Sequence, residues 1–263
     1  MMLTQSLLDY IPIWGIFIAT IVIIILSEEC GYRLGKLRSR QEGKESDSRL
    51  GGMVGAELGL LAFLLAFTFG LAASRFDARR QVLLDETNAI GTTYLRAAML
   101  PEPENTEVRK LLLDYVDWRI KAAQKGLITE AMRQSEKIHK QLWNQAVAAA
   151  KKDPHSIQVG LFVQTLNEMI DLHTKRVTAA LRSRIPLPVW IVLFGVAFLS
   201  FMAMGYQGGI NRTSRSPAVL LVALTFAAVL WLVVSLDRPG EGLLQVNQRP
   251  MIELREMMGN SDQ

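Results

Sequence analysis

Long apolar runs alternate with charged stretches along the chain, and four of the runs are long enough to cross a bilayer. A hydrocarbon core of about 30 Å requires roughly 20 apolar residues in a helix. No ionisable side chain except Tyr206 occurs between Ile185 and Asn211, and none occurs between Pro217 and Leu236. The pattern predicts an all-α integral membrane protein with four transmembrane helices, at about residues 10–26, 50–73, 185–206 and 217–236.

The polar region between the second and third predicted spans is expected to be helical as well. Phe76, Leu83, Ile90 and Ala97 fall seven residues apart, as on one face of a helix that continues out of the second span. Short loops place neighbouring helices antiparallel, so a small four-helix bundle outside the membrane is expected. The predicted divisions are a first transmembrane hairpin (1–73), a helical bundle (74–184), a second hairpin (185–236) and a C-terminal tail (237–263).

Three further bundle helices follow from apolar periodicity and from start and stop signals. They are expected at about residues 105–125, 129–152 and 156–184. Asn105 or Thr106 is the candidate N-cap of the first, and Gly126 is its stop. Asp153-Pro154 closes the second, and the third is expected to run almost directly into the third span.

Basic residues in the short loops favour an extracytoplasmic bundle. The predicted loop 27–49 carries six Lys or Arg, and the loop before the fourth span carries Arg212 and Arg215 without an acid. Such charges mark the cytoplasmic side of a membrane. Seven basic residues flanking the bundle argue the other way, although long domains are translocated largely regardless of charge. The first span has no Lys or Arg before it and no small-residue cleavage site after it, so we expect a retained anchor.

Composition and motifs exclude several classes of protein. Half of the 263 residues are hydrophobic and only one is a cysteine, which excludes a disulfide scaffold. The net charge of +4 is dispersed and offers no nucleic-acid surface. His139, His155 and His173 lack the spacing of a zinc site, and the chain has no phosphate loop or nucleophile elbow. We therefore expect no enzyme, no metal and no cofactor.

Glu57 is the one acidic or basic residue inside a predicted span. A carboxylate in hydrocarbon is costly, so such residues usually face protein or water. One interpretation is a pore-lining or proton-linked site. The other is a shallow carboxyl, roughly 10 Å below the membrane surface, that is hydrogen-bonded to a neighbouring helix.

Small residues surround Glu57 in the sequence. Gly55 and Gly59 form a GxxxG pair, and Gly52 and Ala56 repeat the spacing. Such residues let two helices approach closely. Contact with another helix of the same chain is favoured over contact with a second copy.

A charged cluster follows the second predicted span and consists of Arg75, Asp77, Arg79 and Arg80. It could bind lipid head groups or attract anions. Anchoring at the membrane surface by long basic side chains explains it more simply.

Three stretches resemble a bacterial family of uncharacterised membrane proteins called bestrophin-like: residues 59–81 (GLLAFLLAFTFGLAASRFDARRQ), 185–194 (IPLPVWIVLF) and 235–246 (SLDRPGEGLLQV). The name implies a distant likeness to bestrophins, pentameric anion channels whose second span ends in an aromatic and Arg-rich helix start, where this chain has residues 75–79. The resemblance implies a cytoplasmic bundle, opposite to the charge argument. It also implies a neck of bulky apolar rings, to which no motif here is assigned.

The best-matched motif is the exit of the fourth span. Pro239 is expected to stop the helix and Gly240 to permit a turn. Asp237 is expected to cap the following amides or pair with a bundle arginine. A gate or ion contact is the alternative role.

Two functions remain open after these arguments. The first is an oligomeric ion channel or conduit in the bacterial cytoplasmic (inner) membrane, surrounded by the lipid bilayer. The second is a non-conducting scaffold or sensor that uses the helical bundle to contact a protein partner.

Overall fold

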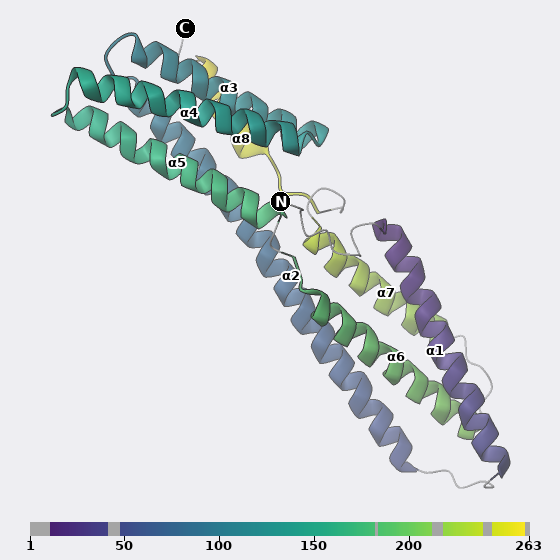
Figure 1. Ribbon diagram of the computed structural model, residues 1–263. Helices are drawn as coiled ribbons and strands as arrows, with labels where there is room; N and C mark the ends of the chain where they lie inside the picture. Colours follow the sequence, from purple (N-terminus) through teal and green to yellow (C-terminus); the bar gives the residue numbers. More distant parts are fainter. Residues whose placement is uncertain (1–10, 42–47, 182–183, 212–217, 239–243, 261–263) are drawn as a thin grey trace. The chain divides into compact units, whose positions relative to one another are not determined.

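The computed structural model describes residues 11–41, 48–181, 184–211, 218–238 and 244–260, and the chain divides into two compact units. Unit 1 comprises residues 1–76 and 183–245, and unit 2 comprises residues 77–182 and 246–263. Within the described residues every regular element is an α-helix (Figure 1).

Unit 1 contains the helices with membrane-spanning character. These are α1 (Ile13–Gln41), the first part of α2 (Ser48–Ala97), α6 (Leu187–Ile210) and α7 (Ala218–Asp237). All four are long and apolar enough to cross a bilayer, which confirms an all-helical chain with four candidate spans. Their shared core includes Trp190, Leu193 and Phe201 of α6 and Leu230 and Val233 of α7.

The first helix is much longer than predicted. It was expected to end near Leu26, but α1 continues to Gln41, so most of the predicted loop 27–49 is helix. Charge does not interrupt it, because Glu29 and Arg33 pair one turn apart with Nε and Oε1 2.7 Å apart. The last bundle helix and the third span lie close to their predicted bounds, because α5 ends at Leu181 and α6 begins at Leu187, and residues 182–183 between them are outside the described residues.

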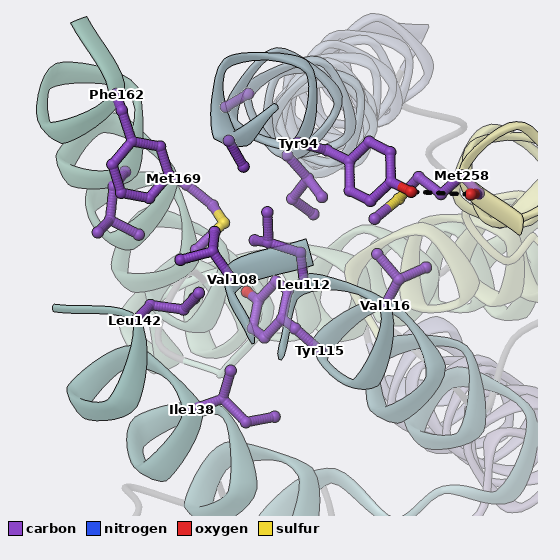
Figure 2. Packing of buried hydrophobic residues seen from close by; sticks show 14 of the residues in the cluster. Tyr94, Val108, Leu112, Tyr115, Val116, Ile138, Leu142, Phe162, Met169 and Met258 are labelled. Atoms are coloured by element: carbon purple, nitrogen blue, oxygen red, sulfur yellow. Dashed lines mark hydrogen bonds between the residues drawn. The ribbon is translucent and has the colours of Figure 1, made fainter. Parts of the chain in front are cut away.

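Unit 2 combines the rest of α2 with α3 (Glu104–Lys125), α4 (Ile128–Lys152), α5 (Ile157–Leu181) and α8 (Arg249–Asn260). The continuation of the second span as one helix through Ala97 is confirmed. Figure 2 shows Val108, Leu112 and Tyr115 of α3 packed among residues of α4 and α5. All three side chains are fully buried.

The residue that ends α3 was predicted correctly, whereas the residue that caps its start was not. Gly126 follows the helix with φ of 68°, in the left-handed region that favours glycine. The N-terminal prediction is wrong, because Pro103 occupies the cap without a side-chain bond. Asn105 lies inside the helix, where its Nδ2 donates to the carbonyl of Ala98.

The segment expected as a tail contains α8, which the apolar pattern did not indicate. Met251 and Met258 are fully buried in the core of unit 2. The Tyr94 hydroxyl donates to the backbone oxygen of Met258 at 2.9 Å (Figure 2). Arg255 makes a two-pronged contact with Asp117, with Nε 2.7 Å from Oδ1. The bundle core therefore includes a helix from beyond the fourth span.

Candidate functional site

One face of the apolar part of α2 is exposed along its whole length. It comprises residues spaced three or four apart, which fall on one side of a helix. We call this face the α2 stripe, and each of its members is exposed: Gly52, Ala56, Gly59, Phe63, Phe67, Gly70 and Ser74. Phe63 is 66% exposed and Phe67 is 58% exposed.

The predicted packing of these glycines against another helix of this chain is wrong for the described residues. A Cβ added at Gly52, Gly55, Gly59 or Gly70 would meet no described atom within 4 Å. Small residues on a membrane helix lower its contact with lipid and permit close approach of another helix. The α2 stripe is therefore not covered by another described helix at its glycines, and Phe63 and Phe67 are its two large side chains.

Glu57 is also exposed but does not lie on the stripe. It follows Ala56, which places it about 100° further round the helix. Only its backbone is bonded across helices, where the Ser200 hydroxyl lies 3.4 Å from the Glu57 carbonyl oxygen. The predicted hydrogen bond of a buried carboxyl to a neighbouring helix is not present among the described contacts.

The close helix contact of unit 1 lies elsewhere, between α1 and α6. A Cβ at Gly205 would overlap the carbonyl oxygen of Glu28, and one at Gly209 would overlap that of Tyr32. Gly31 and Gly35 are equally restricted from the α1 side. Two GxxxG pairs therefore face each other, and substitution at any of the four requires the helices to move apart. This pair was not predicted, because the two α1 glycines lie in the segment 27–49 that was expected to be a loop.

The span-exit motif makes hydrogen bonds to segments that lie next to helix ends within unit 1. Asp237 Oδ1 accepts from the Ile185 backbone amide at 3.0 Å, and Arg184 Nη1 donates to the Asp237 carbonyl oxygen at 3.0 Å. Arg238 Nη1 donates to the carbonyl oxygen of Ile11 at 2.7 Å. Asp237 Oδ1 thus accepts from the segment that leads into α6, whereas the predicted capping of the amides that follow residue 238 concerns residues outside the described ones and stays a prediction. Pro239 and Gly240 lie outside the described residues.

The predicted charged cluster spans the division between the two units. Arg75 belongs to unit 1, whereas Asp77, Arg79 and Arg80 belong to unit 2. Asp77 and Arg80 are exposed, Arg75 is half-buried and Arg79 is buried. The burial of Arg79 does not fit the expectation that all the basic side chains of this cluster are solvated anchors at the membrane surface.

The main polar feature that sequence reasoning missed is a charged cluster inside unit 2. At its centre is Glu86 of α2, which is fully buried. Arg119 of α3 donates two hydrogen bonds to its carboxylate, with Nη2 3.0 Å from Oε2 and Nε 3.2 Å from Oε1. Arg176 of α5 adds an ion pair at 3.0 Å from Nε to Oε2, and the Tyr115 hydroxyl donates to Oε1 at 2.7 Å. One carboxylate thus joins three helices through two guanidinium groups and a phenol.

Two histidines complete this cluster. His139 of α4 and His173 of α5 meet edge to face with ring centroids 4.9 Å apart. Arg176 Nη2 lies 3.1 Å from His173 Nδ1. A guanidinium only donates, so His173 Nδ1 accepts and the ring is neutral. His139 Nε2 is buried and has no hydrogen-bond partner among the described residues.

Burial and positive neighbours keep both imidazoles uncharged at neutral pH. Desolvation lowers the pKa of His139 to about 4, with Arg176 acting in the same direction and Glu86 against it. Desolvation, Arg176 and His139 together lower the pKa of His173 to about 3. Desolvation also raises the pKa of Tyr115. Among the described residues no three His, Cys, Asp or Glu side chains come together as a metal site.

Comparison with known proteins identifies the family. A bacterial Bestrophin homolog from Klebsiella pneumoniae has a similar structure: one variant gives a TM-score of 0.64 at 14% identity, covering 94% of this chain and 96% of that one. A second structure of that homolog, phased on zinc, gives 0.63 at 16% identity, covering 93% and 97%. A structure described only as a membrane protein gives 0.65 at 15% identity, covering 94% and 96%. No significant match was found among curated proteins.

The structural matches show the fold, and the sequence match shows the family. A profile of the Bestrophin-like domain covers residues 32–251, which include α2 to α7 and the start of α8. This chain is a membrane protein and belongs to the Bestrophin-like family.

Proposed function

We propose that the chain assembles with copies of itself into an ion-conducting pore of the bacterial cytoplasmic membrane, with the α2 stripe facing the shared pathway. The observation that carries the proposal is the exposure of this stripe. Lipid-facing positions are normally filled by large apolar side chains, whereas the stripe alternates small residues with two phenylalanines. Family membership adds support, since the bestrophin likeness implies a neck of bulky apolar rings.

Phe63 and Phe67 are the candidates for those rings. They are one helical turn apart on the stripe, and both are more than half exposed. An apolar constriction gates ions by excluding water. Glu57 lies beside the stripe and is proposed as a modulator of the pathway rather than its narrowest point.

Flux from reconstituted liposomes tests this proposal. We expect selective ion flux above empty vesicles, and a changed rate when Phe63→Ala and Phe67→Ala shorten the two rings. Phe198→Ala is the matched control, because Phe198 is 41% exposed on α6 and lies outside the stripe. A folded oligomer without flux, in either orientation and across a range of pH, would exclude the pore and favour the scaffold. If Glu57→Gln leaves flux unchanged, the modulating role of Glu57 is wrong.

The assembly itself is tested separately. Gly55→Leu adds a side chain beside the α2 stripe, where an added Cβ would meet no described atom within 4 Å, so the monomer should fold. We expect the variant to have a smaller mass in detergent, because the added leucine obstructs a close approach of neighbouring copies. Gly195→Leu on α6 also enters open space and should retain the wild-type mass. Equal masses for the two variants would contradict contact between copies through the side of α2 that carries Gly55.

A further inference from the structure

The buried cluster of unit 2 contains more positive than negative charge. Its members come from each of four helices: Glu86 from α2, Tyr115 and Arg119 from α3, His139 from α4, and His173 and Arg176 from α5. At neutral pH the two arginines face a single carboxylate, and both imidazoles are neutral. The carboxylate is already used by both guanidinium groups and by the Tyr115 hydroxyl.

The carboxylate of Glu86 is already used, so the Tyr115 hydroxyl oxygen, 3.1 Å from His173 Nδ1, is the one neutral acceptor that the described contacts offer to a proton added to either imidazole. His173 Nδ1 is the atom that accepts from Arg176, so a proton there replaces a hydrogen bond by contact between two cations. His139 lies at the edge of the same group, 5.2 Å from the Tyr115 ring centroid, and its buried Nε2 reaches no described acceptor. Both rings are more than nine-tenths buried, and solvation of the new charge requires the helices to separate.

We propose that this cluster is an acid-sensitive latch, in which protonation of His139 and His173 places additional positive charge beside Arg119 and Arg176 and opens the bundle core. The latch concerns unit 2 alone and does not depend on whether the protein conducts ions. Its chemistry is that of a proton-binding site whose occupied form is incompatible with the closed packing.

The sign and size of the effect follow from proton linkage. In an open bundle the imidazoles regain a pKa near 6.5, whereas in the closed bundle they stay neutral down to about pH 4. The open state therefore binds more protons as the pH falls below 6.5, and the closed state loses stability. Each imidazole multiplies the opening equilibrium by up to about tenfold per pH unit. Two together give on the order of a 1000-fold increase between pH 7 and pH 4.5.

Hydrogen exchange of the full-length protein in detergent measures this opening. After correction for the intrinsic pH dependence of exchange, we expect amides of α3, α4 and α5 to lose protection steeply between pH 6.5 and pH 4.5. Protection that stays constant over that range in the wild-type protein would overturn the proposal.

The chain provides a matched control in its third histidine. His155 is exposed in the turn between α4 and α5, so His155→Gln should leave the slope unchanged. His139→Gln or His173→Gln should each reduce the slope by up to about tenfold per pH unit, and the double variant should nearly abolish it. Equal slopes in all variants would assign the effect to other carboxylates and overturn the latch.

One of the single variants is chosen so that the test remains informative if the double variant does not fold. His139→Gln removes no described hydrogen bond from Nε2 and is the variant to interpret if the double variant does not fold. Direct titration of the imidazoles by NMR gives a second measurement. Depressed pKa values for His139 and His173 support the latch, whereas unshifted pKa values for these two imidazoles contradict it.

Discussion

The two parts of α2 have opposite surroundings although they belong to one helix. Its apolar part exposes the α2 stripe, where a Cβ added at Gly52, Gly59 or Gly70 would meet no described atom within 4 Å. Its polar part is the better buried: Leu83, Glu86, Ile90 and Tyr94 are each less than 5% exposed. Hydropathy alone would assign these environments the other way round. The difference indicates that the apolar part meets something outside the chain, whereas the polar part already has its partners within unit 2.

Removing the central charge of the polar part should have the largest effect. Glu86→Gln leaves Arg119 and Arg176 buried without a counter-charge, and loss of one partner of a buried ion pair costs about 3–5 kcal/mol. We expect a loss of that size in the free energy of unfolding, measured by chemical denaturation in detergent. Glu57→Gln makes the same change in the apolar part, where the carboxyl is exposed. Equal losses for the two variants would remove the distinction between the parts.

Glycine substitutions sharpen the contrast between a covered and an uncovered small-residue face. Gly205→Ala forces a methyl group against the backbone of α1, and such overpacking typically costs about 1–3 kcal/mol. Gly55→Ala enters open space and should stabilise the monomer by up to about 1 kcal/mol through helix propensity. Thermal unfolding of the two variants side by side measures both. A destabilised Gly55→Ala monomer would show that the side of α2 carrying Gly55 is packed within the chain.

A smaller effect is expected where α8 meets α2. Tyr94→Phe removes the hydroxyl that donates to Met258 and accepts from Arg109 Nη2 at 2.8 Å. The expected loss is about 1–2 kcal/mol, because two hydrogen bonds with a usual net value of about 1 kcal/mol each are removed, with protection lost first in α8 peptides. Thr92→Val is the control, because Thr92 is exposed and bonds only within its own helix. An unchanged α8 in Tyr94→Phe would mean that apolar packing alone holds it.

The long helices could be predicted because each carries an uninterrupted apolar run or a regular stripe. The partners of buried polar residues could not, since Glu86, Arg119 and Arg176 come from three helices far apart in the sequence. A signal was nevertheless present. Glu86 falls between Leu83 and Ile90 on the face expected to be apolar, and His139 adjoins buried Ile138. A charged or titratable residue on the inner side of a predicted helix is itself an indication of a buried polar network.

The α2 glycines show the opposite limit of the sequence. Gly31-x-x-x-Gly35 and Gly55-x-x-x-Gly59 have the same spacing, yet the first is pressed against α6 and the second is open. Spacing identifies a helix surface on which close approach is possible. It does not identify the partner, because that depends on which helices the fold brings together.

The core of unit 2 includes α8, the last described helix of the chain to be synthesised. The carbonyl group that accepts from the Tyr94 hydroxyl lies 164 residues further along the chain. The buried methionines of α8 are likewise synthesised after α6 and α7. During translation, α2 to α5 therefore leave the ribosome before α8, and the methionines of α8 can join their core only after the last membrane helices have been synthesised. The bundle of unit 2 can therefore be complete only in chains whose membrane helices have already been synthesised.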